Sequence, residues 1–236
     1  DALPILAFGR RKSELAAALF VQTQNFRPQV LITSAWGAMR LYPPRAEIKK
    51  ASDYLSVKAE IQRAQLLKRL VEGGYRSTQI VEDVGDFNVR GSIIDIFCPL
   101  YSHPLRLDFW GDEIESIRLF EPSTQKSLEN LQEAFVCPVR ELVLTPESRD
   151  FGRERIESVA TEQGSYDRHV MNMLKDLDEG LYSPELDRFL PLFYRKMESV
   201  FDYLTHNAMI FIDSQGEVAD ELVSWQEKLE DGHDEH

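Results

Sequence analysis

The sequence predicts an α/β fold in which one layer of helices and buried strands is interrupted by a small β-rich insertion domain. Two short apolar runs, residues 29–34 and 208–213, have the composition of buried parallel strands, and each lies next to segments with helical periodicity. Residues 86–120 hold the densest β-type composition of the chain. Because α/β-type segments lie on both sides of the β-rich stretch, one interrupted layer is the most economical architecture.

The composition is that of an acidic globular protein. The 236 residues, 43% of them hydrophobic, suffice for one large or two smaller domains. A net charge of −13 repels a phosphate backbone, so we expect protein partners rather than sequence-independent binding to nucleic acid. No apolar stretch reaches the ~20 residues that span a bilayer, and we expect a cytoplasmic monomer without membrane contact. Since the chain begins with Asp1 rather than Met, we also expect a piece of a longer protein.

The segment before the β-rich stretch alternates between helical and strand-like patterns. Its candidate elements are a helix within residues 1–26, a strand at 29–34, a helical turn at 36–41 and an amphipathic helical region at 52–73. Gly73-Gly74 is a strong signal for a helix end. We therefore place a domain boundary at about residue 74.

The β-rich stretch contains a hairpin whose register decides which side chains face solvent. Residues 105–110 alternate between apolar and polar, and Gly111-Asp112 turns the chain. A two-residue turn would mix the faces, whereas a three-residue turn sets Leu107 opposite Ile117 and Leu105 opposite Leu119, so we expect the second register. The other face then carries Arg106, Arg118, Trp110, Ile114 and Phe120.

After the hairpin, residues 134–136 are one more strand candidate, and the pattern from residue 145 is helical. A helical face is formed by Val170, Met173, Leu174 and Leu177 and ends at Gly180. Ser183-Pro184 starts a further helix with an aromatic run that we interpret as core. Residues 214–217 have capping-box spacing before a helix at 218–229.

Motifs that carry catalysis are missing from the sequence. It holds no GxxxxGK[ST], GxSxG or HExxH pattern, and no glycine-rich loop follows either strand candidate. The carboxylate pairs Asp112/Glu113 and Asp86/Asp95 are interpreted as turn and strand-surface charges. Cys98 and Cys137 each end an apolar run before a proline, which favours small buried residues, and two cysteines alone cannot form a structural zinc site. We expect no catalytic residue, cofactor or metal.

Two blocks of the β-rich stretch have the sequences VRGSIIDIF (residues 89–97) and RLDFWGDEIESIR (residues 106–118). They closely resemble the insertion domain shared by the excision-repair protein UvrB and the bacterial transcription-repair coupling factor. Outside the insertion, RPQVLITS with RLYPP (residues 27–34 and 40–44) and LPLFY with FDYL (residues 190–194 and 201–204) favour the coupling factor. The similarity covers nearly the whole chain and is most specific between about residues 75 and 125.

The resemblance implies a UvrB-like N-terminal module in three parts, whose first domain begins before Asp1. Residues 1–74 would be part of a degenerate helicase-like (P-loop NTPase-like) α/β domain, residues 75–140 the UvrA-binding insertion domain, and residues 141–236 a helical and α/β return segment. In UvrB the strand equivalent to residues 209–212 ends in an Asp-Glu pair that holds Mg²⁺ and polarises water. This chain has Asp213-Ser214 there, so a carboxylate needed for ATP hydrolysis is missing.

We therefore expect a non-catalytic module that recruits UvrA, and with it nucleotide excision repair, to RNA polymerase stalled at DNA damage. RNA polymerase and DNA would be bound only by a C-terminal part outside this chain, where the family carries an ATP-dependent DNA translocase. One alternative is a working ATPase domain of UvrB itself. Another is a scaffold whose insertion face packs against a different domain of its own chain.

The family binds UvrA through arginines and an aromatic residue on the sheet face of the insertion domain. The matching positions are Arg90, Arg106 and Trp110, with Trp where Phe is usual. Arg106 and Trp110 lie on the face that the register argument leaves exposed, and Arg and Trp are frequent at binding hot spots. The alternative on composition alone is an ordinary solvated sheet face; with the resemblance added, a UvrA-binding face is the preferred interpretation.

Overall fold

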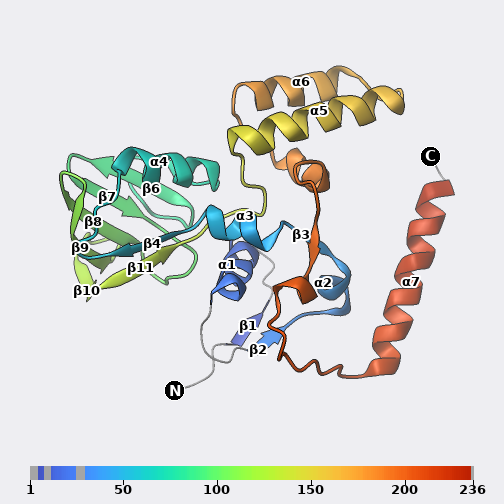
Figure 1. Cartoon of the computed structure of the whole chain (residues 1–236), viewed down its shortest axis with the longest axis horizontal. Coiled ribbons are helices and arrows are strands. Elements are labelled where there is room, and N and C mark those ends of the chain that lie inside the picture. The colour runs from blue at the N-terminus through green and yellow to red at the C-terminus, as the bar shows by residue number, and fades with distance from the viewer. Residues whose placement is uncertain (1–4, 8–11, 25–29, 235–236) are drawn as a thin grey trace.

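The structure is a computed structural model that describes residues 5–7, 12–24 and 30–234. Figure 1 shows a sheet-containing part, a pair of helices above a smaller mixed part, and a last helix that stands to one side. The fold is mixed α/β with a multi-stranded sheet, so the predicted class is confirmed at that level. None of the helices in the described ranges is long and apolar enough to cross a membrane.

A six-stranded sheet forms the β-rich part of the molecule. In spatial order its strands are β10 (Ser127–Leu131), β9 (Glu113–Phe120), β8 (Leu105–Trp110), β7 (Ile93–Ile96), β6 (Asp86–Arg90) and β5 (Arg76–Ser77). All neighbours are antiparallel except β5 and β6. Leu66 and Leu70 of helix α4 (Arg63–Glu72) share one apolar core with Ile94 and Leu107 of the sheet.

The hairpin β8–β9 has the register predicted from its apolar face. The pairs Leu105–Leu119 and Leu107–Ile117 lie opposite each other. The turn is nevertheless the shorter one, because Trp110 pairs with Glu113 and only Gly111 and Asp112 lie between the strands. The register shifts between Asp108 and Phe109, where β9 has one extra residue. A two-residue turn and a bulge together thus produce the register that we had expected from a three-residue turn.

Two apolar residues that were predicted on the solvent face are buried, for different reasons. Ile114 and Phe120 were expected on the solvent face, and both are fully buried. Ile114 lies opposite Phe109 on the core side, because the extra residue reverses the facing of β9 beyond the bulge. Phe120 is covered by the guanidinium of Arg106, which lies 4.1 Å from the centre of its ring.

Residues 52–73 contain a strand as well as a helix, so the prediction of one helical region was partly wrong. Strand β4 (Asp53–Ser56) pairs antiparallel with β11 (Glu133–Val136), which confirms the strand predicted at 134–136. Helix α4 begins only at Arg63 and ends, as predicted, at Gly73. The partner of β4 lies far away in sequence, and local periodicity could not reveal that pairing.

The smaller mixed part begins with two parallel strands. β1 (Ile5–Ala7) and β2 (Val30–Ile32) are joined by helix α1 (Lys12–Thr23). The remaining elements here are α2 (Ala35–Met39), β3 (Leu41–Tyr42), α3 (Arg45–Lys50) and β12 (Glu198–Ser199), the last paired with β3. The helix predicted within residues 1–26 is confirmed for α1, but residues 5–7 of that range form the strand β1 instead. Residues 1–4, 8–11 and 25–26 lie outside the described residues. Strand β2 is confirmed, but it is partly exposed rather than buried.

The C-terminal part of the chain is largely helical. Its helices are α5 (Pro146–Glu162), α6 (Arg168–Asp178), the 3₁₀ helices η1 (Pro184–Leu192) and η2 (Val200–Tyr203), and α7 (Gln215–Asp234). The Thr145 side chain accepts a hydrogen bond from the first turn of α5, and Asp167 accepts two from α6. The aromatic run after η1 is confirmed as core, since Phe193 and Tyr194 are buried with Leu174.

The strand predicted at residues 208–213 is not formed. This segment is an exposed connection to α7, and Met209 and Phe211 are among the most exposed apolar side chains in the described chain. A strand needs an adjacent edge to satisfy its backbone groups, whereas the β1–β2 sheet has two strands and neither pairs with this segment. An apolar run indicates a tendency to be buried and does not identify a partner.

Candidate functional site

The solvent face of the sheet places polar side chains in two neighbouring rows across the strands. One row crosses the sheet through Asn88, Asp95, Arg106 and Arg118, which pair in that order from β6 to β9. In the next row, Arg90 lies opposite Ile93, which in turn lies opposite Asp108. Cross-strand neighbours on one face are close enough to interact directly, so the pairing alone brings these charges together.

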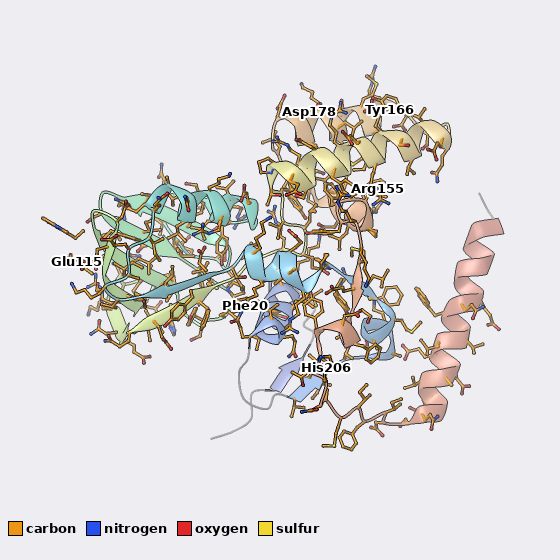
Figure 2. All side chains as sticks on the ribbon, viewed as in Figure 1. Phe20, Glu115, Arg155, Tyr166, Asp178 and His206 are labelled. Carbon is orange, nitrogen blue, oxygen red and sulfur yellow. The ribbon has the colours of Figure 1, made fainter. Side chains whose placement is uncertain are left out.

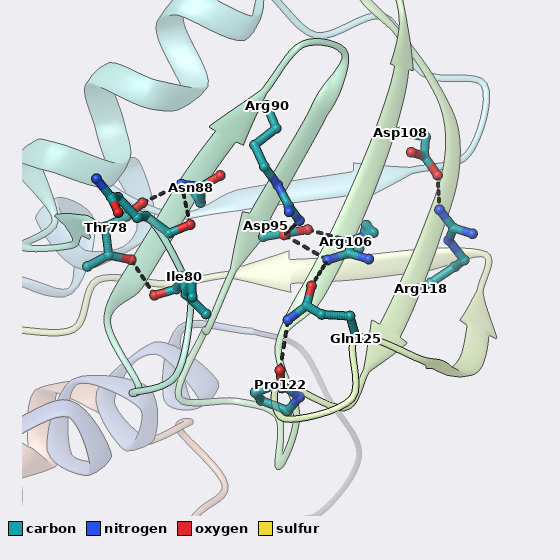
Figure 3. A network of polar contacts seen from close by, with 11 residues as sticks. Thr78, Ile80, Asn88, Arg90, Asp95, Arg106, Asp108, Arg118, Pro122 and Gln125 are labelled. Atoms are coloured by element: carbon teal, nitrogen blue, oxygen red, sulfur yellow. Dashed lines mark hydrogen bonds and ion pairs between the residues drawn. The ribbon is translucent and has the colours of Figure 1, made fainter.

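Asp95 is the centre of an ion-pair cluster on this face (Figure 3). Arg106 donates from Nε to Oδ1 of Asp95 at 2.7 Å and from a terminal nitrogen to Oδ2 at 2.9 Å, a two-pronged contact. Arg90 donates a third hydrogen bond to Oδ2 at 2.8 Å. The Asp95 side chain is only 4% exposed, so its charge depends on the two guanidinium groups for compensation.

Arg106 is held from a second side by the turn between β9 and β10. Its terminal nitrogen also donates to Oε1 of Gln125 at 2.7 Å, and the Gln125 amide donates to the carbonyl of Pro122 at 2.8 Å. With Phe120 beneath it, the Arg106 side chain is only 12% exposed. The hydrogen bonds to Asp95 raise the pKa of Arg106, which therefore stays charged at every physiological pH. The predicted exposure of Arg106 is thus largely wrong.

Arg90 and Trp110 are the two predicted site residues that reach solvent. Arg90 ends β6, and its side chain is 53% exposed although one of its nitrogens is bound to Asp95. Trp110 ends β8, just before the turn at Gly111, whose φ of +61° suits a residue without a side chain. Trp110 is 76% exposed, an unusual state for so large an apolar ring. The predicted exposure of Trp110 is therefore confirmed.

The charges of the two rows do not cancel. Asp95 offsets one of the two arginines bound to it, so that cluster keeps one positive charge. Arg118 and Asp108 form a separate and balanced pair, to which the Ser116 hydroxyl also donates. The excess positive charge therefore reaches solvent at Arg90, the more exposed of the two arginines.

Asp95 is the residue that sequence reasoning misjudged at this site. Asp86 and Asp95 were both interpreted as strand-surface charges, yet both are buried and each is paired with an arginine, Asp86 with Arg76 at 2.8 Å. The available signal was a single carboxylate inside the apolar run of residues 93–97. A charge at such a position requires a paired partner, and the nearby arginines could have been considered for that role. Gln125 carried no comparable signal.

The other groups considered from the sequence make no second site. Cys98 and Cys137 are free and buried, as predicted, with their sulfur atoms 3.9 Å apart; burial raises the pKa of the Cys137 thiol well above its ordinary value. Asp213 and Ser214 lie in the exposed connection before α7. Within the described residues, no cluster of three or more His, Cys, Asp or Glu side chains could hold a metal ion.

A family model identifies the part of the chain that carries this face. Residues 54–142 match the model described as the UvrB interaction domain. The match includes β4 and α4 as well as the six-stranded sheet, in agreement with the shared core of these elements. By this comparison the sheet-containing part belongs to the class of UvrB-type interaction domains.

Two relatives extend the similarity beyond that domain. The chain is 35% identical over 229 residues to a transcription-repair-coupling factor of Myxococcus xanthus, a match that covers 94% of this chain and 19% of the relative. It is 30% identical over 199 residues to that of Bacillus subtilis (strain 168), covering 80% of this chain and 17% of the relative. The predicted resemblance is confirmed: the chain is a UvrB-like N-terminal module of the transcription-repair coupling factor type, and it spans about a fifth of the length of these relatives.

Proposed function

We propose that this chain is a non-catalytic module that recruits UvrA, and through it nucleotide excision repair, to RNA polymerase stalled at DNA damage. The chain itself binds UvrA, whereas RNA polymerase and DNA are bound by other parts of the longer protein that its relatives represent. The module acts as a monomer in the cytoplasm.

One observation carries the proposal. The match to the UvrB interaction domain covers a sheet face on which Trp110 and Arg90 are exposed, and Arg90 belongs to the cluster that keeps an excess positive charge. Exposed Trp and Arg side chains on one face are typical of the residues that dominate binding energy at interfaces. An apolar anchor and an unbalanced charge thus lie on the same face of one sheet.

The charges of the face indicate which chemistry UvrA must present. The free side of Arg90 suits a carboxylate, because the planar guanidinium can donate two parallel hydrogen bonds to it. Trp110 then supplies a large apolar surface that excludes water from this pair. We therefore propose that Arg90 and Trp110 contact UvrA directly and that Arg106 belongs to the same site chiefly as their support.

The parts outside the insertion domain fit a helicase-like layer that has lost its activity. The unit β1–α1–β2 has two parallel strands joined by a helix, which is the building block of such α/β layers. We propose that residues 1–74, which contain this unit, and the return segment (residues 141–236) form a degenerate domain of the P-loop NTPase type. The lack of a carboxylate at Ser214, together with the exposed position of Asp213, supports the absence of ATP hydrolysis by this part.

Calorimetric titration of the purified chain with purified UvrA tests the proposal. The chain should bind UvrA, and Arg90→Ala or Trp110→Ala should each weaken binding by about tenfold or more, because truncating a hot-spot side chain removes ~1.4 kcal/mol or more. Lys175→Ala on α6, far from the sheet in Figure 1, is the control and should bind like the parent. Absence of UvrA binding by the parent, or ATP turnover that Asp213→Ala abolishes, would contradict the proposal.

A further inference from the structure

Asp95 joins the two arginines of the proposed UvrA-binding face but does not reach the surface itself. We propose that Asp95 is a positioning residue: its buried carboxylate fixes the guanidinium groups of Arg90 and Arg106 in the arrangement that UvrA recognises, and Gln125 supports this arrangement from the neighbouring turn. The inference rests on the proposed function and adds to it a residue that acts through others.

The hydrogen bonds assign different tasks to the two arginines. Arg106 uses its Nε and one terminal nitrogen on Asp95 and Gln125, and its side chain is almost covered. Arg90 gives Asp95 a single terminal nitrogen. Within the described part of the chain, the other N–H groups of Arg90 have no hydrogen-bond partner, and the side chain is half exposed. Arg90 can therefore meet a carboxylate while Asp95 keeps its guanidinium in place (Figure 3).

Positioning matters here because an unrestrained arginine is a poor partner. Its long side chain samples many rotamers, and the loss of that freedom on binding opposes association. The two guanidinium groups, which come from the strands on either side of β7, also repel each other as like charges. The carboxylate of Asp95 attracts both guanidinium groups and fixes their direction. It thereby reduces both the rotamer freedom and the repulsion before UvrA binds.

The direction in which one substitution changes UvrA affinity distinguishes positioning from simple electrostatic attraction. Asp95→Asn keeps the size of the side chain and removes its negative charge, so the face becomes more positive. If charge alone attracted an acidic partner, the variant would bind UvrA more tightly. If Asp95 positions the arginines, the variant binds more weakly in spite of the added positive charge.

The experiment measures UvrA binding by calorimetry for the whole chain and for three variants, each checked for folding by its thermal transition. Asp95→Asn should weaken binding by about tenfold, similar to the loss of a well-oriented charge pair. Asp86→Asn is the matched control, because Asp86 is equally buried and paired with the exposed Arg76, and it should change affinity by less than about twofold. Gln125→Asn shortens the second support, and Asn tolerates the positive φ of 60° at this position; it should weaken binding by about threefold.

A double-mutant cycle distinguishes positioning from a general loss of structure. In an Arg90→Ala background, Asp95→Asn should have a much smaller effect than in the parent, because the exposed arginine that Asp95 positions for contact is gone and only the covered Arg106 remains. Equal or tighter binding by Asp95→Asn, or an effect of equal size in both backgrounds, overturns the inference while the proposed function stands. If Asp95→Asn fails to fold, unchanged affinity of Gln125→Asn overturns it instead. Absence of UvrA binding by the parent chain is the separate outcome that removes the proposed function.

Discussion

At the scale of residues, the three predicted contact residues have different structural roles. Trp110 and Arg90 reach solvent, whereas Arg106 is hydrogen-bonded to Asp95 and Gln125 and lies over the ring of Phe120. Removal of Arg106 would leave the buried carboxylate of Asp95 without its main partner, which is strongly unfavourable. Arg106 therefore stabilises the sheet in addition to forming part of its solvent face. Substitutions at Arg90 and Arg106 should therefore differ in their effect on folding.

We expect Arg106→Ala to lower the free energy of unfolding by about 1–3 kcal/mol, because Asp95 loses its two-pronged partner. Arg90→Ala should lower it by less than about 1 kcal/mol, since Arg90 is half exposed and water screens its ion pair. Urea unfolding of the two variants and the parent measures both changes. Equal unfolding midpoints for the two variants would show that Arg106 does not support the sheet.

At the scale of elements, the sequence predicted what local pattern encodes and missed what depends on distant pairing. The register of β8–β9 followed from its apolar alternation, and the ends of α4 and α6 followed from glycines. The bulge in β9, the strand β4 and the absence of a strand at residues 208–213 depend on backbone partners elsewhere in the chain. The exposure of Trp110 followed from local alternation and was predicted correctly. The burial of Arg106 depends on Asp95 of another strand and was not predicted.

Helix α5 offers a test of packing between elements. A Cβ added at Gly152 would lie 2.3 Å from the buried ring of Phe193, so the two helical segments need a residue without a side chain there. Gly152→Ala should destabilise the protein by about 1–3 kcal/mol, in spite of a gain in helix propensity of up to ~1 kcal/mol. Gly216→Ala in α7 is the control, because nothing lies within 4 Å of its added Cβ, and it should be neutral or stabilising. Thermal unfolding of both variants is the measurement; equal melting temperatures would contradict the packing argument.

At the scale of the whole molecule, one ion pair joins the end of the UvrB-type domain to the smaller mixed part. Arg40, after α2, donates to Glu141 at 2.6 Å across 101 residues of sequence. Glu141 is buried, and its second carboxylate oxygen has no hydrogen-bond partner among the described residues. Burial raises the pKa of Glu141 above its ordinary value of 4.5, an effect that Arg40 only partly opposes.

The raised pKa gives stability a defined dependence on pH. A carboxyl whose pKa is higher in the folded state holds its proton more tightly there, so its contribution to stability falls as pH rises from 4.5 through the raised value. Glu141→Gln removes this dependence. The melting temperature of the variant should therefore rise relative to that of the parent between about pH 5 and pH 8. A relative fall over the same range would show that the attraction of Arg40 outweighs burial.

The central claim, that UvrA binds the sheet face around Trp110, is tested most directly by site-specific photocrosslinking. A photoreactive benzoylphenylalanine replaces Trp110 in one variant and Tyr166 in another; both positions are exposed, and Figure 2 shows Tyr166 on the helical pair, away from the sheet. Irradiation with purified UvrA should join the chain to UvrA through position 110 and not through position 166, since only the first lies at the proposed interface. Crosslinks through position 166 alone, or binding of UvrA without a crosslink at position 110, would contradict the account.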